Sequence, residues 1–189
     1  MDRKEVLRRA FSFSMAEEGR DKYTDDPRDA GGPTKWGVAL NYNRDVIPDK
    51  DGNGIINAAD VQQLTEADAL GIYEKRYWQP NIKAEYPDAL AFMLVDMMLN
   101  PGPGASPRLL QKACNACGQK IDVDGDIGAQ TLAAVSAVNL LALLRALADQ
   151  RLAYYQSRPK FPVYGKGWTG RTGVALMQQC KSRKGVRNG

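Results

Sequence analysis

The stretch EGRDKYTDDPRDAGGPTKWG, from Glu18 to Gly37, decides how this chain is interpreted. A glutamate ends an apolar helical stripe, and a loop rich in glycine, proline, aspartate and aromatic residues follows it. This layout predicts a cleft that cleaves carbohydrate, because a glycosidase needs a carboxylic acid beside a loop that admits a sugar chain.

Upstream of this stretch, mostly apolar residues recur with the spacing of one helix face. That face comprises Leu7, Ala10, Phe11, Ser14, Met15 and Glu18. Glu17 is rotated by about 100° from it, so Glu18 is the glutamate that points with the apolar side. Burial penalises the charged form of a carboxyl and raises its pKa, which keeps the proton that an acid catalyst must donate. A glutamate that only caps the helix is the alternative interpretation.

Several residues of the opening stretch resemble the signature of the glycoside hydrolase family 108 endolysins and muramidases, which reads EGGY, PxDxGG and TxxG. They are Glu18, Gly19, Tyr23, Pro27, Asp29, Gly31, Gly32, Thr34 and Gly37. The second glycine of the signature is absent, and two additional residues precede Tyr23. The resemblance continues through residues 64–78, 96–100, 123–131 and 167–171, so it covers nearly the whole chain.

The resemblance implies a mainly α, lysozyme-like fold with a small loop or hairpin lobe and a helical lobe. It also implies hydrolysis of peptidoglycan between N-acetylmuramic acid and N-acetylglucosamine, with Glu18 as the general acid. We expect a catalytic part at residues 1–85 and a helical, peptidoglycan-binding-like part at residues 86–189, packed as one unit. A phage endolysin of this kind would collect in the host bacterial cytoplasm and reach the periplasm and cell wall after a partner holin opens the membrane.

Asp29 and Thr34 are the candidates to act with Glu18. Asp29 would stabilise positive charge at the anomeric carbon or orient a water molecule, and Thr34 would hold that water. Asp25 and Asp26 compete with Asp29 for this role. A carboxyl separation of about 5 Å would favour retention, and one of about 6.5–9.5 Å would favour inversion.

Four further residues are predicted to contact sugar: Tyr23, Trp36, Asp96 and Asn100. Asp96 and Asn100 lie one helical turn apart and share a face, although an asparagine before a proline also ends helices. Trp168 and Arg171 fit a motif of the same family, and we interpret them as a core residue and its salt bridge.

Residues 49–60, DKDGNGIINAAD, match the pattern of an EF-hand-like calcium loop. The metal-ligating positions are filled by Asp49, Asp51, Asn53, the carbonyl of Ile55, Asn57 and Asp60. Asp60 replaces the usual glutamate, and Pro48 argues against a regular incoming helix. We expect a calcium ion with a structural or modulatory role and no cofactor for catalysis. The alternative is a turn that needs no metal.

Composition excludes several classes of protein. The 189 residues contain no histidine and only 3 cysteines, which removes Cys–His and Ser–His nucleophiles and leaves a zinc site short of ligands. Cys114 and Cys117 form a CxxC pair, which we interpret as buried free thiols on helices. The net charge is +4, and its basic clusters lack the aromatic interleaving of a nucleic-acid platform, so we expect no nucleic-acid partner.

Helical periodicity predicts helices at about 4–18, 60–78, 88–99, 106–117, 129–138, 140–157 and 172–183, with a short hairpin within 20–57. The apolar run 132–148 is interrupted by Ser136, Asn139 and Arg145, so we interpret it as the central core helix and not as a membrane span. The N-terminus has no continuous apolar region, so neither a signal peptide nor an anchor is expected. We expect a monomer.

Two other functions fit the same residues. A lytic transglycosylase works with a single glutamate and releases an anhydro sugar, so its product differs from that of a hydrolase by the mass of one water. A non-catalytic, calcium-dependent wall-binding protein would hold glycan with its helical part, and Glu18 would only cap its helix. Lysis of sacculi by wild type but not by Glu18→Gln would exclude the second alternative.

Overall fold

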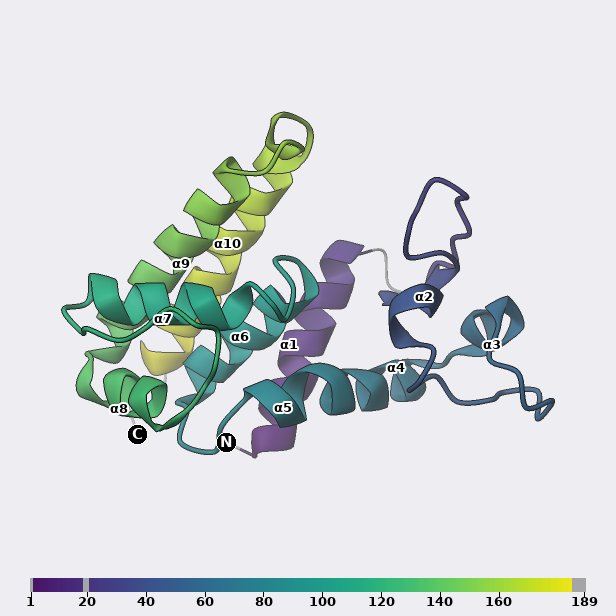
Figure 1. Ribbon diagram of the computed structural model, residues 1–189, viewed down its shortest axis with the longest axis horizontal. Helices are drawn as coiled ribbons and strands as arrows, with labels where there is room; N and C mark the ends of the chain where they lie inside the picture. The colour runs from purple at the N-terminus through teal and green to yellow at the C-terminus, as the bar shows by residue number, and fades with distance from the viewer. Residues whose placement is uncertain (1, 19–20, 185–189) are drawn as a thin grey trace. The chain divides into compact units, whose positions relative to one another are not determined.

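The computed structural model describes residues 2–18 and 21–184, with side chains for all of these except 17, 18, 178 and 180–184. The chain divides into two compact units, Asp2–Pro80 and Asn81–Gly189, and each is described by itself. Helices are the main regular structure of both units, and the first unit adds a small hairpin and long loops (Figure 1). The predicted mainly α fold with a small hairpin is therefore confirmed.

The first unit combines one long helix with a hairpin and several short helices. Its elements are α1 (Arg3–Glu18), β1 (Thr34–Lys35), β2 (Val38–Ala39), α2 (Leu40–Asn43), α3 (Ala58–Gln63), α4 (Glu66–Tyr73), the π-helix η1 (Glu74–Trp78) and the start of α5 (Gln79–Asn81). The strands are antiparallel, with Thr34 opposite Ala39 and Lys35 opposite Val38.

The predicted apolar stripe forms the buried face of α1. Leu7, Ala10, Phe11, Ser14 and Met15 are each at most 3% exposed. The ring of Phe11 meets Tyr73 of α4 edge-on, with ring centroids 4.9 Å apart. Because each large apolar side chain buried in this way contributes about 1.5–3 kcal/mol, the stripe fixes which side of α1 faces α4.

The single helix predicted over 60–78 is wrong. Leu64 leaves the helical conformation with φ −56° and ψ 131°, and α4 begins afresh at Glu66. Thr65 and Asp68 form a capping box, since each side chain accepts a hydrogen bond from the other residue's backbone N–H. This box satisfies the first amides of α4, and a new helix start therefore outweighs the continuous apolar period.

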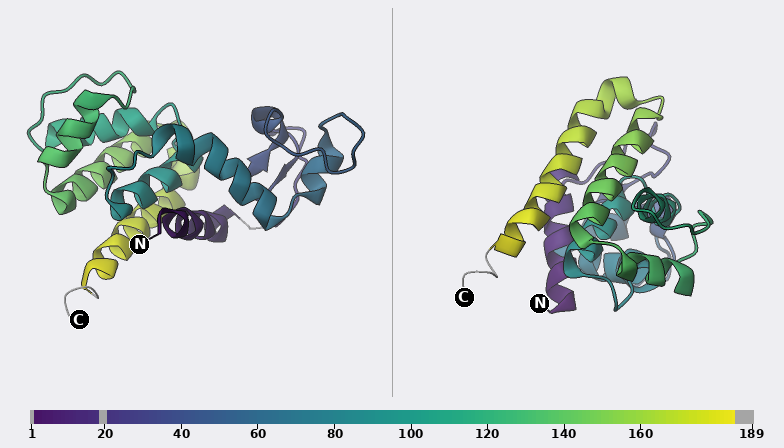
Figure 2. Two further views of the ribbon diagram at one scale, coloured as in Figure 1. Left: turned by 90° about the horizontal axis from the view of Figure 1, so that it is seen from below. Right: turned by 90° about the vertical axis from the view of Figure 1, so that its left-hand side faces the viewer.

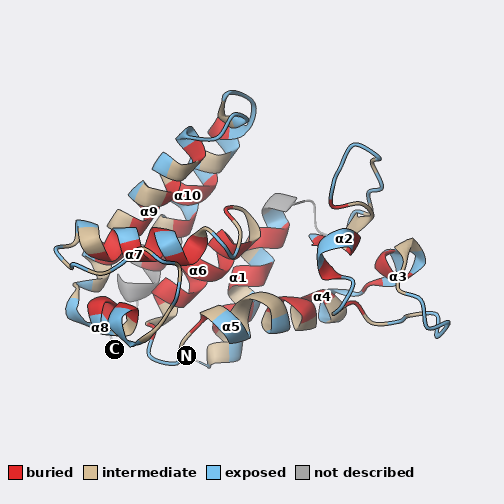
Figure 3. Ribbon diagram, viewed as in Figure 1, coloured by how far each residue is buried: buried red, intermediate tan, exposed pale blue. Residues whose placement is uncertain are grey.

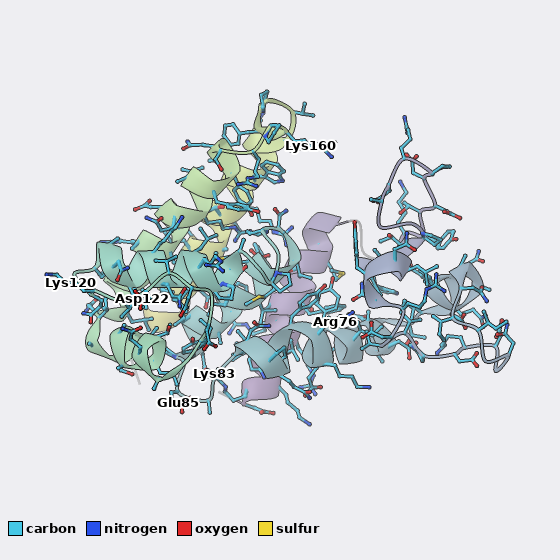
Figure 4. All side chains as sticks on the ribbon, viewed as in Figure 1. Arg76, Lys83, Glu85, Lys120, Asp122 and Lys160 are labelled. Atoms are coloured by element: carbon cyan, nitrogen blue, oxygen red, sulfur yellow. The ribbon has the colours of Figure 1, made fainter. Side chains whose placement is uncertain are left out.

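A bidentate arginine ties α2 to η1 in the same unit. Arg76, labelled in Figure 4, donates to both carboxylate oxygens of Asp45 at 3.0 and 2.6 Å and to the carbonyl of Tyr42 at 2.7 Å. These bonds hold the segment that follows the hairpin against the helix that follows α4.

The second unit is a helical bundle around one buried helix. Its elements are α6 (Asp88–Leu99), α7 (Ser106–Ala116), α8 (Ala129–Ala137), α9 (Leu140–Gln156) and α10 (Phe161–Lys184). Every residue from 89 to 98 of α6 is buried, as Figure 3 shows in red. The central core helix is thus α6 and not the run 132–148, which breaks at Val138 and Asn139 into α8 and α9.

No single helix in the described part of the chain has the length and apolar content to cross a membrane. Among the described helices, only α8 and α9 taken together reach this length and apolar content, and the pair is bent by 117°. Asn139 causes the break, because its side-chain oxygen accepts hydrogen bonds from the amides of Leu141 and Ala142 and so caps α9.

Helix α10 starts at Phe161, although periodicity predicts a start near residue 172. Its first half contains several glycines, which lower helix propensity by about 1 kcal/mol each relative to alanine. Tertiary packing compensates: α10 lies antiparallel beside α9 in every view (Figure 2), and Trp168 stacks on Tyr155 of α9 with centroids 5.0 Å apart. Gly165 is buried, and a Cβ there would lie 2.8 Å from the ring of Phe161.

Candidate active site

The end of α1 and the hairpin meet through two side chains. Tyr73 donates its hydroxyl to the carbonyl of Trp36 at 3.3 Å. A Cβ added to Gly37 would lie 2.5 Å from that hydroxyl and 3.2 Å from the Cε of Met15. Met15 comes three residues before Glu18 and shares its helix face. The turn of the hairpin therefore lies against the part of α1 that immediately precedes Glu18.

The hairpin turn itself is strained. Trp36 has φ 54° and Gly37 has φ 69°, and Trp36 is the one non-glycine residue with positive φ in the described chain. Two consecutive left-handed residues make the tight turn that suits the twist of a two-stranded ribbon. A bulky residue held in this conformation is uncommon and costs about 1–2 kcal/mol, and such strain is concentrated at functional sites.

A second turn presents Asp29 before the hairpin. Its Oδ1 accepts the amide of Gly31 at 2.9 Å, and its side chain is exposed. Gly31 is buried, and a Cβ added there would lie only 3.0 Å from the Cβ of Ala39. Gly32 has φ 67°. The glycine pair therefore lets the loop pass tightly under β2, and the second oxygen of Asp29 has no hydrogen-bond partner among the described residues.

Thr34 begins the hairpin. Its backbone pairs with Thr24 through two hydrogen bonds of 2.9 and 2.8 Å. Its Oγ1 donates to the carbonyl of Gly32 at 2.8 Å. The hydroxyl proton is therefore used within the loop, and the hydroxyl oxygen retains lone pairs that accept a hydrogen bond from water.

The three aspartates of the loop that compete for the role of second carboxylate have different surroundings. Asp26 binds Arg28 through both oxygens, at 2.9 and 2.7 Å, and the arginine lowers its pKa. Asp25 accepts the hydroxyl of Tyr23 at 3.4 Å. Partial burial and the charge of Asp25 raise the pKa of Tyr23. Asp29 alone among them has no side-chain donor in the described part, which favours it over its two competitors.

The side chain of Glu18, the predicted acid, lies outside the described part of the structure. Helix α1 includes Glu18 as its last residue. Tyr23 and Trp36, predicted to contact sugar, are both half-buried in the same unit as Glu18. Asp29, Thr34 and Trp36 thus lie on the loop and hairpin that follow α1.

The calcium-like loop brings three carboxylates together. Asp49, Asp51 and Asp60 each offer an oxygen, and these oxygens lie within 4.8 Å of one another. Asp49 accepts the amides of Gly52 and Gly54 at 2.7 and 2.8 Å. The bond from Gly54, the larger cause, lowers the pKa of Asp49, so the group stays ionised near neutral pH.

The other predicted oxygen positions of this loop follow the same path. Asn53 accepts the amide of Ile55 at 2.7 Å, and the carbonyl of Ile55 accepts the amide group of Asn57 at 3.0 Å. Asp60 accepts the amides of Asn57 and Lys50, which lowers its pKa, and so also caps α3. Each carboxylate oxygen has two acceptor positions, so these bonds leave capacity for a cation. The donor set is that of a hard, oxygen-binding ion.

The loop is connected to the hairpin through α3. Lys35 of β1 donates to the carbonyl of Gln62 in α3 at 2.7 Å. Asp60 belongs to the first turn of the same helix. The loop and the strand that carries Thr34 are therefore linked through α3.

Asp96, predicted to contact sugar, has another role. It is 0% exposed and lies in the second unit. Its Oδ2 accepts from Arg151 at 2.6 Å, and its Oδ1 accepts from Arg171 at 2.9 and 2.6 Å. Burial alone would raise the pKa of Asp96, but the two arginines outweigh it and lower the pKa. The carboxylate is the centre of a buried ion triad, in place of the sugar contact that spacing predicted.

The remaining predicted residues of this unit divide in the same way. Asn100 ends α6 as its C-cap and is half-buried. Trp168 stacks on Tyr155, and Arg171 completes the triad, so the structural interpretation of these two residues is confirmed. Of the CxxC thiols, Cys114 is buried and Cys117 is half-buried, and both are free.

Sequence reasoning missed Tyr73, which joins α1, α4 and the hairpin. No local motif marks it, because its partners Phe11 and Trp36 lie far away along the chain. The indirect signal is Gly37, whose missing side chain leaves space for the tyrosine hydroxyl.

Comparison with known proteins yields two family matches and a structural match. Residues 11–102 match the model of Glycosyl hydrolase 108, and residues 105–172 match that of a Predicted Peptidoglycan domain. A solved structure of SagA from Brucella abortus is 30% identical to this chain, covers 94% of it and 95% of its own chain, and superposes with a TM-score of 0.76. No curated protein matches the chain.

Proposed function

The chain belongs to the glycosyl hydrolase 108 family, and from this membership we propose that it cleaves the bond between N-acetylmuramic acid and N-acetylglucosamine, with Glu18 as the general acid. The family makes it a glycoside hydrolase of peptidoglycan, and the second match adds a peptidoglycan-binding domain. The particular bond and the particular acid are our proposal.

The contact of Met15 and Tyr73 with the hairpin turn supports this proposal most directly. A Cβ at Gly37 would lie within 3.2 Å of both side chains, so the hairpin sits one helical turn from the end of α1. Thr34 and the half-buried Trp36 belong to this hairpin. Acid catalysis needs a proton donor next to the glycosidic oxygen, and an indole ring offers a flat apolar surface for a sugar.

Asp29 is the second carboxylate of the proposal, and Thr34 holds water. Asp29 has one oxygen bound to the loop amide of Gly31 and keeps the other for solvent or substrate. Asp26 is neutralised by Arg28, which disfavours it as a partner for a developing positive charge. The hydroxyl oxygen of Thr34 accepts a hydrogen bond from the water that Asp29 orients.

Calcium is proposed as the ion of the loop at residues 49–60. Three carboxylate oxygens within 4.8 Å repel one another unless a cation lies between them. The nearby ammonium of Lys50 is bound instead to Asp68 at 2.9 Å. A bound Ca²⁺ would order the loop and, through α3 and Lys35, the hairpin; it takes no part in the chemistry.

The test uses purified sacculi and two matched variants. Glu18→Gln keeps the size of the side chain but removes its acidic proton, so release of soluble muropeptides should fall by about 100- to 10,000-fold. Glu17→Gln makes the same change on the neighbouring residue, rotated away on α1, and should act within about threefold of wild type. Mass spectrometry of the products should show addition of one water.

Three outcomes contradict this assignment. Retained lysis by Glu18→Gln removes Glu18 from the mechanism. A loss in Glu17→Gln alone transfers the role to that residue. Anhydro products from wild type identify a lytic transglycosylase with the same glutamate. Asp29→Asn, compared with Asp26→Asn, tests the second carboxylate in the same assay.

A further inference from the structure

A cavity of about 570 Å³ opens in the second unit, between the ends of α7 and α8 and the first half of α9. Its volume is typical of pockets that hold small ligands. Its apolar lining comes from Val138 and from alanines of the three helices, and its polar groups come from Cys117, Asn139, Arg145, Asp149 and Gln150. All of these residues fall within the match to the peptidoglycan domain.

Two opposite charges of this pocket are unpaired. Arg145 and Asp149 make no hydrogen bond or ion pair with any residue that the structure describes. They lie one turn apart on α9, close enough to pair. Arg145 precedes Asp149 along the helix, and an ion pair with the cation first is the less favourable order, because each charge then opposes the helix dipole. The pocket therefore presents a free cation and a free anion side by side.

The neighbouring polar groups are also available. The oxygen of Asn139 caps α9, accepting from Leu141 and Ala142 at 3.0 and 3.2 Å, which leaves its amide hydrogens as donors. Gln150 has no partner among the described residues. A ligand in this pocket therefore meets apolar side chains, an amide donor and two opposite charges.

We propose that this pocket binds the peptide part of peptidoglycan at a residue that carries both a free amine and a free carboxylate, as the diamino acid of the stem peptide does. The carboxylate pairs with Arg145, the ammonium pairs with Asp149, and the hydrocarbon chain lies on the alanines and Val138. The choice of ligand rests on the proposed action on peptidoglycan. Glycan itself has no ammonium group for Asp149, because its amino groups are acetylated.

The test is direct binding of a defined probe to the full chain by calorimetry. The probe is the tripeptide L-alanyl-γ-D-glutamyl-meso-diaminopimelate. The double variant Arg145→Ala/Asp149→Ala should bind it at least about fivefold more weakly, because exposed charge pairs are each worth a few-fold in affinity. The matched control is Lys112→Ala/Asp122→Ala, which also removes one charge of each sign, from exposed positions outside the pocket (Asp122 is labelled in Figure 4).

Two modified probes assign the pairs. Acetylation of the distal amine should weaken binding to wild type but not to Asp149→Ala. Amidation of the adjacent carboxylate should weaken binding to wild type but not to Arg145→Ala. As a positional readout, bound probe should slow alkylation of the half-buried Cys117, and mass spectrometry can compare it with the buried Cys114.

Absence of binding by wild type, equal affinity of the double variant, or equal sensitivity of both single variants to both modifications overturns the proposal. The proposal is also overturned if peptide-free glycan strands protect Cys117 from alkylation and the tripeptide does not. Cleavage of peptide-free strands is measured in parallel and should be unchanged in every pocket variant. A wild type that binds the tripeptide but cleaves no glycan would refute the proposed function alone.

Discussion

Asp96→Asn should destabilise the second unit strongly and leave the chemistry of the folded enzyme unchanged. The wild-type carboxylate is 0% exposed and accepts hydrogen bonds from Arg151 and Arg171. Asparagine keeps one acceptor oxygen but turns an NH₂ group toward guanidinium donors. Both buried arginines then lose the negative charge of Asp96.

The magnitude follows from the burial. Breaking a fully buried ion pair costs about 3–5 kcal/mol, because the remaining charge is left without a partner. A chain of 189 residues that unfolds cooperatively loses roughly 2–4 °C in Tm per kcal/mol, so we expect a fall of roughly 6–20 °C. Asp122→Asn, at an exposed carboxyl, should change stability by less than about 0.5 kcal/mol.

The assay combines urea unfolding with kinetics on sacculi at a temperature where Asp96→Asn is still folded. A structural residue gives a lower urea midpoint and an unchanged kcat and KM. A wild-type midpoint together with a raised KM would refute the reasoning and restore Asp96 as a sugar contact. Should Asp96→Asn fail to fold, the triple change Asp96→Leu/Arg151→Met/Arg171→Met offers a second measurement, since apolar replacement of a whole buried triad is often close to neutral.

Three further predictions concern the first unit and the response to pH. Gly37→Ala should destabilise by more than the roughly 1–2 kcal/mol of left-handed strain, because its Cβ would lie 2.5 Å from the Tyr73 hydroxyl; Gly118→Ala, with φ 93° and an open Cβ position, should show the strain alone in urea unfolding. Ca²⁺ at about 100 times its Kd should stabilise the protein by roughly 2.7 kcal/mol in thermal melts, and Asp49→Asn should lose this response; a response that survives would remove the loop as the calcium site. The pKa of Asp96 is lower in the folded protein than its unfolded value of about 3.9. The stabilisation that this carboxylate contributes is therefore present above about pH 3.9 and is lost as the pH falls through the lower folded pKa. The acid-induced drop in unfolding free energy should accordingly be shallower in Asp96→Asn than in wild type.

Sequence reasoning correctly predicted the helices whose ends are marked by residues close together in the sequence. The stripe of α1 and the boundary between the helices predicted at 129–138 and 140–157 depend on residues a few positions apart, and the structure contains both. The prediction of a single helix over 60–78 was wrong for a related reason. Its capping box at Thr65 already marks a helix start, yet the apolar period runs through it.

The start of α10 was not predictable from such signals. Its glycines oppose a helix, and only the stacking of Trp168 on Tyr155 and the pairing of Arg171 with Asp96 outweigh them. Both contacts join residues that are distant in sequence or lie on another helix.

The sequence by itself determined the mainly helical fold, the acidic loop at residues 49–60 and the family of the chain, because these depend on spacing within short segments. Only the tertiary structure decided that Asp96 lies at the centre of a buried ion triad, that Tyr73 joins the hairpin to α1, and that Arg145 and Asp149 share a pocket without a partner. The physical reason is that burial and charge pairing depend on which distant segments approach one another, and residue type at one position does not encode that approach.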